Sequence, residues 1–171
     1  GQGLADRVAA PELIAIPAGS FIAGSDGEER DAAYDLDQAA YGHGRTREWG
    51  WYDDERPRGR HALPQYEITR NLITNRQYAA FIAATHHPAP EVDRKTWRGY
   101  GLIHPYHRTR RHAWKTGRPP EGRLDHPVVM VSHNDAKASA AWLRKQGPGI
   151  WRLPHELEWE KAARGTDGRR L

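Results

Sequence analysis

Short apolar runs predict several strands in this chain. Leu13–Ile16 is followed by a Pro-Ala-Gly turn and by a second apolar run at Ser20–Gly24, which is typical of two short strands. Gln65–Thr69 alternates polar and apolar residues and predicts a third strand. Val128–Val131 is a continuous apolar run, and its simplest interpretation is a buried strand.

A first helix is predicted to begin after Thr74. Thr74 and Gln77 have the spacing of a capping box, in which the hydroxyl accepts a bond from the third helical amide and the glutamine accepts one from the cap. The apolar residues Tyr78, Phe81 and Ile82 follow at helical spacing. They predict a single buried stripe.

Two further helices are predicted towards the end of the chain. Ser132 is a good cap residue and is followed by Asp135 in the first turn, where a negative charge suits the helix dipole. This helix is expected to end at Gly147. Pro154 leads into a third helix with acids at its start and bases at its end, which also suits the dipole. Gly165 is its expected terminator.

Two long segments, residues 25–60 and 89–125, have no sustained hydrophobic period. We expect loops there, and loops of such length are usually functional or disordered. The aromatic residues of the first segment indicate that it packs onto something. Together the elements predict two or three short helices, several short strands and long loops over residues 13–171, preceded by an arm of residues 1–12.

Composition excludes several classes of protein. The chain has 171 residues, with 26 Lys+Arg against 22 Asp+Glu, and no cysteine. Disulfides, thiolate metal sites and cysteine nucleophiles are therefore excluded within the chain. No apolar run approaches the ~20 residues of a membrane span, and no secretion signal is expected. The lack of cysteine is compatible with an extracytoplasmic (periplasmic) location.

Basic residues gather between His104 and Arg123, where Glu121 is the only acid. One interpretation is a nucleic-acid or phosphate groove, in which arginines hold phosphates and aromatic rings stack on bases. The other is a solvated loop whose arginines pair with the acids of residues 26–37 and 53–55. No nucleic-acid motif accompanies the patch, so the second interpretation is favoured and nucleic acid is not expected as a partner.

Four blocks of the chain, in order, resemble one protein family. The most specific block runs from Arg152 to Gly165 and reads Arg-Leu-Pro-His-Glu-Leu-Glu-Trp-Glu-Lys-Ala-Ala-Arg-Gly. The others are Ile16–Ser25, Ile73–Phe81 and His126–Ala136. This pattern resembles the formylglycine-generating enzyme family, also called the sulfatase-modifying-factor family. The resemblance implies that family's α+β variant of the C-type-lectin-like fold, with the two long segments as loop excursions.

The resemblance implies mainly architectural roles for the matched residues. Thr74 and Asn75 would fix the start of the first helix. Arg152 and the acids of the third helix would form a buried charge network, and Trp159 would anchor the core. The candidate structural residues are Thr74, Asn75, Asp135, Arg152, Glu156, Glu158 and Trp159.

The family pattern normally continues beyond the last matched block. In catalytic members, that later stretch carries the paired cysteines that hold copper and most of the calcium ligands. No catalytic residue and no cofactor can therefore be assigned to this chain. We expect the chain to be the N-terminal part of such a domain, incomplete by itself. Any active site would lie in a missing C-terminal part or on a second polypeptide that completes the fold.

Two other functions remain open, a noncatalytic lectin-like binding module and a structural subunit of a complex. In the binding module, aromatic and arginine-rich loops would meet a protein partner. The candidate binding residues are Arg45, Trp49, Trp51, Tyr52, Arg108, Arg111 and Trp114. For the first four of these residues, the simpler interpretation is that the aromatics cover the core under a long loop.

No metal site is assigned from the sequence. His133 and His155 stand where the family pattern has tryptophan and threonine, and imidazole suits several transition metals. A third ligand for a metal shared by these two is not apparent. His104, His107 and His112 form a second group, but the neighbouring arginines would repel a cation.

Overall fold

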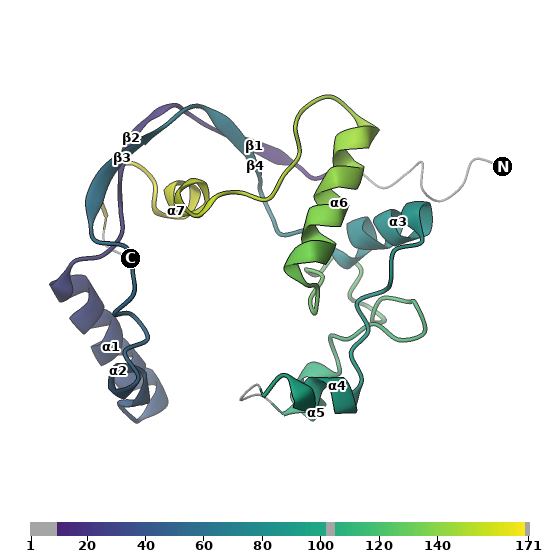
Figure 1. Ribbon diagram of the computed structural model, residues 1–171, viewed down its shortest axis with the longest axis horizontal. Helices are drawn as coiled ribbons and strands as arrows, with labels where there is room; N and C mark the ends of the chain where they lie inside the picture. The colour runs from purple at the N-terminus through teal and green to yellow at the C-terminus, as the bar shows by residue number, and fades with distance from the viewer. Residues whose placement is uncertain (1–9, 102–104, 170–171) are drawn as a thin grey trace. The chain divides into compact units, whose positions relative to one another are not determined.

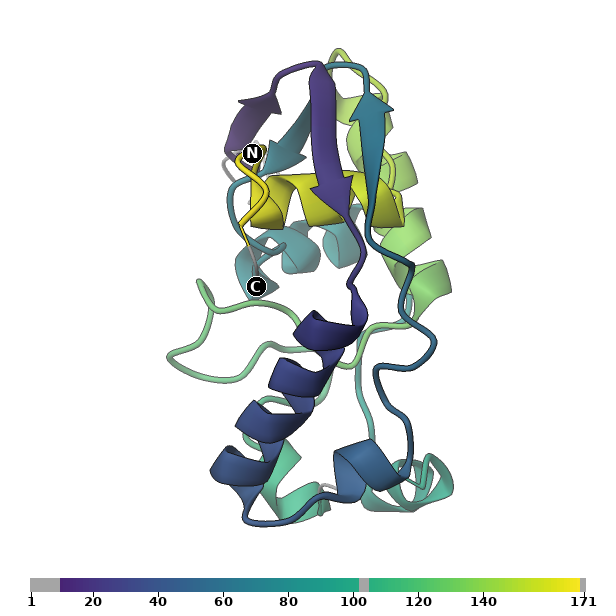
Figure 2. The ribbon, with the colours of Figure 1, turned by 90° about the vertical axis from the view of Figure 1, so that its left-hand side faces the viewer.

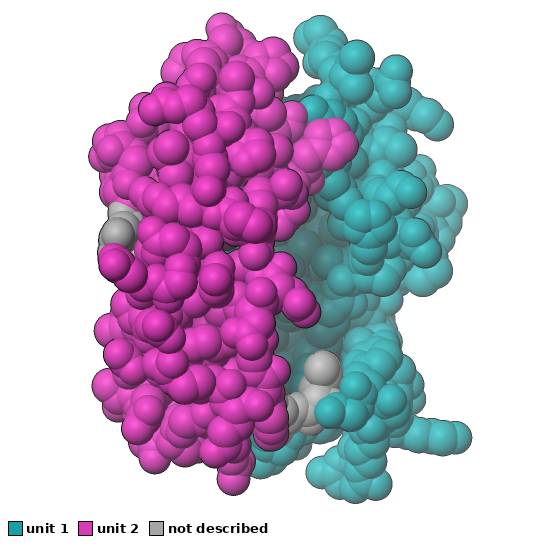
Figure 3. Space-filling model, turned by 60° about the vertical axis from the view of Figure 1, so that its left-hand side comes forward, with its two compact units in different colours: residues 1–14, 69–153 teal, residues 15–68, 154–171 magenta. Residues whose placement is uncertain are grey.

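The computed structural model describes residues 10–101 and 105–169. Most of the predicted arm of residues 1–12 lies outside these ranges, and so does His104. The chain divides into two compact units (Figure 3). Unit 1 comprises Gly1–Ile14 and Thr69–Leu153, and unit 2 comprises Ala15–Ile68 and Pro154–Leu171. Within the described residues, none of the helices is long and apolar enough to cross a membrane.

The described strands pair as two separate two-stranded sheets (Figure 1). They are β1 (Leu13–Ile16), β2 (Gly19–Ala23), β3 (Gly59–Leu63) and β4 (Tyr66–Thr69). The three strands predicted before residue 70 are present, but β1 and β2 do not pair with each other, because β1 pairs with β4 and β2 with β3. The antiparallel β2–β3 pair places Phe21 opposite His61. The sequence analysis did not predict β3, because its sequence, Gly-Arg-His-Ala-Leu, is mostly polar and has no apolar run that would indicate a strand.

Unit 2 contains two helices where loops were expected, α1 (Gly27–Tyr41) and α2 (Arg45–Glu48). The loop prediction is therefore wrong for residues 27–41 and 45–48 and, in the second long segment, for residues 94–99 and 106–109. Tyr34 is the buried residue of α1, so the helix has no apolar stripe that periodicity could detect. Its readable signal is local, since Asp26 and Glu29 form a capping box at its start.

The third predicted helix is α7 (Glu156–Arg164), which lies against the β2–β3 pair in unit 2 (Figure 2). Lys161 is 2 % exposed, and its Nζ donates to the carbonyls of Pro17 at 2.7 Å and Gly19 at 3.1 Å. Trp159 is 58 % exposed, so its prediction as a core anchor is wrong. Helical geometry places Trp159 on the side of α7 opposite Lys161.

Unit 1 contains four helices among its described residues: α3 (Asn75–Thr85), α4 (Arg94–Gly99), α5 (Tyr106–Thr109) and α6 (His133–Gln146). Its core is the aromatic cluster of Tyr78, Phe81 and Trp114, each 2 % exposed. The proposal of Trp114 as a binding residue is therefore wrong, because its ring is enclosed by the core. Trp142 of α6 packs on Phe81, with ring centroids 5.9 Å apart.

Residues 128–131 do not form the predicted buried strand. A single isolated bridge joins Thr74 to Pro127, and the Val128 amide donates to the Ile73 carbonyl at 2.9 Å. Val129 is 37 % exposed. Met130 has φ 63°, a left-handed conformation that interrupts extended backbone. The segment therefore contributes packing to unit 1 without belonging to a sheet.

The start of α3 is held by a buried amide side chain. Thr74 caps the helix through the predicted capping box with Gln77. Asn75 is 2 % exposed, and its Nδ2 donates to the Arg123 carbonyl at 2.9 Å. Its Oδ1 accepts from Nε1 of Trp114 at 2.7 Å. One side chain thus ties α3 to the loop before α6 and to the core tryptophan.

We expect Asn75→Ala to destabilise the chain by about 2–4 kcal/mol, because two buried hydrogen bonds disappear and the Trp114 indole N–H is left without an acceptor. Urea unfolding followed by tryptophan fluorescence measures this effect. Asn134→Ala is the control, since Asn134 is exposed on α6 and should change stability by less than about 0.5 kcal/mol. Equal midpoints for the two variants would contradict the structural role given to Asn75.

Candidate functional site

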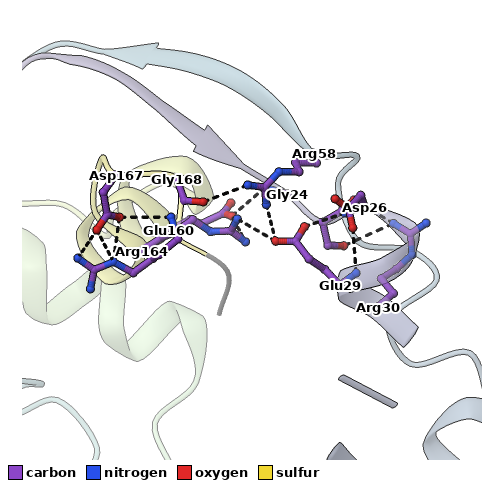
Figure 4. Close-up of polar contacts among 11 residues, drawn as sticks. Gly24, Asp26, Glu29, Arg30, Arg58, Glu160, Arg164, Asp167 and Gly168 are labelled. Atoms are coloured by element: carbon purple, nitrogen blue, oxygen red, sulfur yellow. Dashed lines mark hydrogen bonds and ion pairs between the residues drawn. The ribbon is translucent and has the colours of Figure 1, made fainter. Parts of the chain in front are cut away.

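A buried ionic network joins α1 and α7 in unit 2 (Figure 4). Glu29 of α1 forms an ion pair with Arg58, and Arg164 Nη1 lies 3.8 Å from Glu29 Oε1. Arg164 Nη2 lies 3.3 Å from Glu160 Oε1, which also accepts the Gly24 amide at 2.8 Å. The side chains of Arg164 and Glu29 are only 5 % and 9 % exposed. Charges so deeply buried need partners, so the network constrains how these segments pack.

Arg152 is exposed, and one of its contacts is a hydrogen bond to the carbonyl of its neighbour Leu153, so the arginine of the predicted charge network is not buried. Glu156 is exposed as well and pairs with Arg56 at 3.0 Å. Glu158 is buried, and its carboxylate accepts the His155 amide at 2.8 Å. The buried arginine of this sequence block is instead Arg164, near its other end.

Sequence analysis attributed the basic residues at the end of α7 to the helix dipole, and so it missed the burial of Lys161 and Arg164. The signal that could have found them is the helical spacing of Glu158, Lys161 and Arg164, three residues apart. That spacing places all three on one face.

A second polar cluster lies at the start of α6 in unit 1. Asp135 Oδ2 accepts from the amide of Ser132 at 2.8 Å and from its hydroxyl at 2.7 Å, while Oδ1 lies 2.7 Å from His87 Nε2. Burial alone would raise the pKa of Asp135, but the hydrogen bonds from Ser132 and His87 outweigh it and hold that pKa below its usual value. Asp135 therefore completes, as a carboxylate, the capping box that Ser132 begins at the start of α6.

This cluster lacks the geometry of nucleophilic catalysis. The carboxylate of Asp135 stands between Ser132 and His87, whereas an activated serine needs the imidazole as its immediate neighbour. Tyr78 is adjacent in the core, and burial together with the charge of Asp135 raises its pKa to about 12. Within the described residues its buried hydroxyl has no hydrogen-bond partner. The arrangement can hold a helix start but has no poised proton acceptor.

Residues 45–52, here called the tryptophan turn, carry most of the predicted binding residues. Trp49 and Trp51 are 59 % and 53 % exposed, and their ring centroids lie 6.0 Å apart. Arg45 is also exposed, at the start of α2. Tyr52 is half-buried, and its hydroxyl donates to Asp37 at 2.7 Å, which together with burial raises its pKa to about 12. The structure thus brings these four predicted residues together on one turn.

Tyr34 of α1 holds the tryptophan turn in place. It is 4 % exposed, its hydroxyl donates to Asp53 at 2.9 Å, and it accepts the Tyr52 amide at 2.9 Å. The rings of Tyr34 and Tyr52 lie 4.8 Å apart. Tyr34 is one of the aromatic residues of this segment that were expected to pack onto something, and its buried hydroxyl has two hydrogen-bond partners, as is usual for a buried tyrosine.

The basic segment lies in unit 1, where Arg108 and Arg111 are exposed. Arg111 Nε donates to His112 Nε2 at 2.9 Å. Partial burial lowers the pKa of His112, and so do the nearby charges of Arg123 and Arg111. The positive potential around His112 opposes cation binding there.

Metal ligands do not converge within residues 10–101 and 105–169, where no group of three or more His, Cys, Asp or Glu side chains could hold an ion. His133 begins α6 in unit 1 and His155 precedes α7 in unit 2, and both are exposed. With no cysteine anywhere in the chain, the residues present do not fit the copper-thiolate centre that the resemblance implies for catalytic members. No reaction step through copper is derived for this chain.

Comparison with known proteins establishes the family. The model of the sulfatase-modifying factor enzyme 1-like domain matches residues 3–171. The chain belongs to this family. It is 34 % identical over 173 residues to a formylglycine-generating enzyme from Thermomonospora curvata, covering 90 % of this chain and 48 % of that protein. A Streptomyces coelicolor protein of the same name is 36 % identical over 138 residues, which cover 66 % of this chain and 40 % of the relative.

The chain thus spans about half the length of the curated relatives it matches. Similarity also extends to a Bos taurus protein named inactive C-alpha-formylglycine-generating enzyme 2, which is 56 % identical over 43 residues, 25 % of this chain and 12 % of that protein. Membership of the family therefore does not by itself establish activity.

We expect Glu29→Gln to destabilise the chain by about 2–4 kcal/mol, because it removes one of the two carboxylates beside the buried Arg164 and weakens the Arg58 pair. Urea unfolding followed by circular dichroism gives the measurement. Glu55→Gln is the control, since Glu55 is exposed in the same unit. A Glu29→Gln midpoint equal to that of the control would show that the network carries no net stability.

The lowered pKa of Asp135 predicts a pH dependence. Its stabilising contribution is full above the unfolded pKa of about 3.9 and is lost as the pH falls through the lower folded value. Asp135→Asn should cost about 1 kcal/mol near neutral pH, and this difference should shrink below about pH 4. Urea midpoints across that range test it, with exposed Asp54→Asn as the control. A difference that stayed constant in acid would contradict the capping role.

Proposed function

We propose that this chain is the scaffold portion of a sulfatase-modifying-factor-type domain. Its fold would be completed by a C-terminal part or a companion polypeptide that carries any active site. The observation that supports this most directly is the combination of a family match over residues 3–171 with the absence of cysteine from all 171 residues. Formylglycine generation, the activity in the names of the relatives, would depend on the partner segment.

The contacts of the matched blocks support the scaffold role. Arg164 and Lys161 bind α7 to its neighbours in unit 2, while Asn75 and Asp135 hold helix starts in unit 1. Each of these polar side chains is engaged with another part of the chain, as expected for residues that maintain a fold. The family's copper and calcium would be held mainly by the other segment.

A second candidate function is a noncatalytic binding module, which the exposed Trp49 and Trp51 favour. The name of the inactive Bos taurus relative is compatible with a family member that binds without turnover. In that case the chain would fold alone and have no need of a completing polypeptide.

Native mass spectrometry of the protein from its source, followed by denaturation, separates these functions. The scaffold proposal expects a native mass larger than that of the 171-residue chain. Denaturation should then either release a second polypeptide or leave a single polypeptide longer than this chain. We also expect no aldehyde from the 171-residue chain alone on a peptide that the Thermomonospora curvata enzyme converts, with or without copper, while the complete native assembly forms it.

A cooperative, monomeric 171-residue chain in the native sample would refute the scaffold proposal and favour the binding module. Aldehyde formation by the chain alone would refute both, because the chemistry would then reside in these residues. The Thermomonospora curvata enzyme itself is the positive control for the aldehyde assay.

A further inference from the structure

Trp49 and Trp51 form an aromatic surface that the scaffold role does not use. Both indoles are more than half exposed and lie 6.0 Å apart, whereas Trp114 of unit 1 is 2 % exposed. A single exposed apolar side chain needs no explanation, but neighbouring exposed tryptophans are characteristic of binding surfaces.

The tryptophan turn is fixed before any ligand arrives. The Trp51 amide donates to the Thr46 carbonyl at 3.1 Å, and the buried Tyr34 hydroxyl accepts the next amide. Gly50 between the indoles has φ +62°, and a Cβ there would lie 2.6 Å from an Asp53 carboxylate oxygen. Both the positive φ and this close approach favour glycine at this position. A preformed turn loses little conformational entropy when it binds a partner.

The surroundings of the turn are negatively charged. Residues 26–55 contain ten acids against three arginines. Of these arginines, Arg47 is already engaged, pairing with Asp31 and Asp35 at 2.8 Å each. The carboxylates of Glu48, Asp54 and Glu55 are exposed, and none of them forms a hydrogen bond or ion pair within the described residues.

We propose that the tryptophan turn docks a lysine- or arginine-bearing segment of a partner protein, with the cation over the indole faces and the free carboxylates around it. Tryptophan is the best aromatic partner for a cation, and flanking carboxylates add long-range attraction. A nucleic acid or an anionic membrane would be repelled by the same charges. A purely apolar segment would leave the carboxylates unused. The proposal does not depend on whether the chain supports formylglycine formation.

Fluorescence anisotropy of labelled peptides against the whole 171-residue chain tests this proposal. The probe is a ten-residue peptide alternating Arg or Lys with Gly, and its matched control has Gln at every basic position. We expect saturable binding of the cationic peptide that weakens as salt rises from low to physiological ionic strength. The glutamine peptide should not bind.

Variants separate the indole contribution from charge alone. The double variant Trp49→Leu/Trp51→Leu keeps apolar bulk but removes the π faces, and it should weaken binding by at least about fivefold, as for a hot-spot aromatic. Trp49→Phe/Trp51→Phe should keep part of the affinity. Trp159→Leu is the matched control, because Trp159 is equally exposed at 58 % but lies on α7, and it should leave binding unchanged.

Glu48→Gln/Asp54→Asn/Glu55→Gln should lower the affinity and flatten its salt dependence. Circular dichroism confirms that each variant remains folded. The proposal is overturned if the leucine double variant binds like the parent chain, or if the glutamine peptide binds equally well.

Sedimentation of the chain without peptide tests a second copy as the occupant, because the basic segment of unit 1 has the required chemistry. Concentration-dependent association that is abolished by the tryptophan double variant would identify another copy of this chain and overturn the proposed partner. A monomer that binds the cationic peptide supports the proposal.

Discussion

The burial of Arg164 is the constraint on which the packing of unit 2 depends. Its side chain is 5 % exposed, and a guanidinium cannot be neutralised at physiological pH, so the fold must bring carboxylates to it. Glu160 comes from the same helix, but Glu29 comes from α1, more than a hundred residues earlier in the chain. Arg58 shares Glu29 and thereby ties the end of the loop before β3 to the same point.

In unit 1, a neutral buried side chain joins distant segments of the chain. Asn75 satisfies both the Arg123 carbonyl and the Trp114 indole, so a loop without regular structure is fixed to the start of α3. Both units have small apolar cores, and the aromatic cluster of unit 1 contains three fully buried rings. In a loop-rich fold, where strands supply few backbone ladders, side-chain hydrogen bonds to the backbone take over part of the work of positioning segments.

The elements that could be predicted from the sequence are those with local signals. Capping boxes at Thr74 and Ser132 located α3 and α6, and glycine ended α7. The α1 helix was missed because periodicity was used where only a cap was informative, as Asp26 and Glu29 show.

Burial was harder to predict than helix boundaries. Trp159 was expected inside but is 58 % exposed, whereas Lys161, which was given only a role at the helix dipole, is buried. Which face of a helix is covered depends on distant segments, here β2 and α1, and hydrophobicity alone does not determine it. Trp114 was expected at a surface because of its arginine neighbours, yet it is 2 % exposed and its indole contacts Tyr78 and Asn75 of α3. The candidate binding residues that remain exposed, Trp49, Trp51 and Arg45, are placed by Tyr34, whose role depends on a tertiary contact.

Fold and recognition are distributed differently along this chain. The blocks that resemble the family form α3, α6, α7 and the strand before α1, and their polar residues are engaged in holding those elements. The tryptophan turn lies between the matched blocks, in residues 25–60, and its exposed indoles stabilise nothing that the described contacts reveal. A segment freed from maintaining the core can change its surface without endangering the fold. The turn that Tyr34 holds is therefore a better place to look for recognition than the residues that pack α3, α6 and α7.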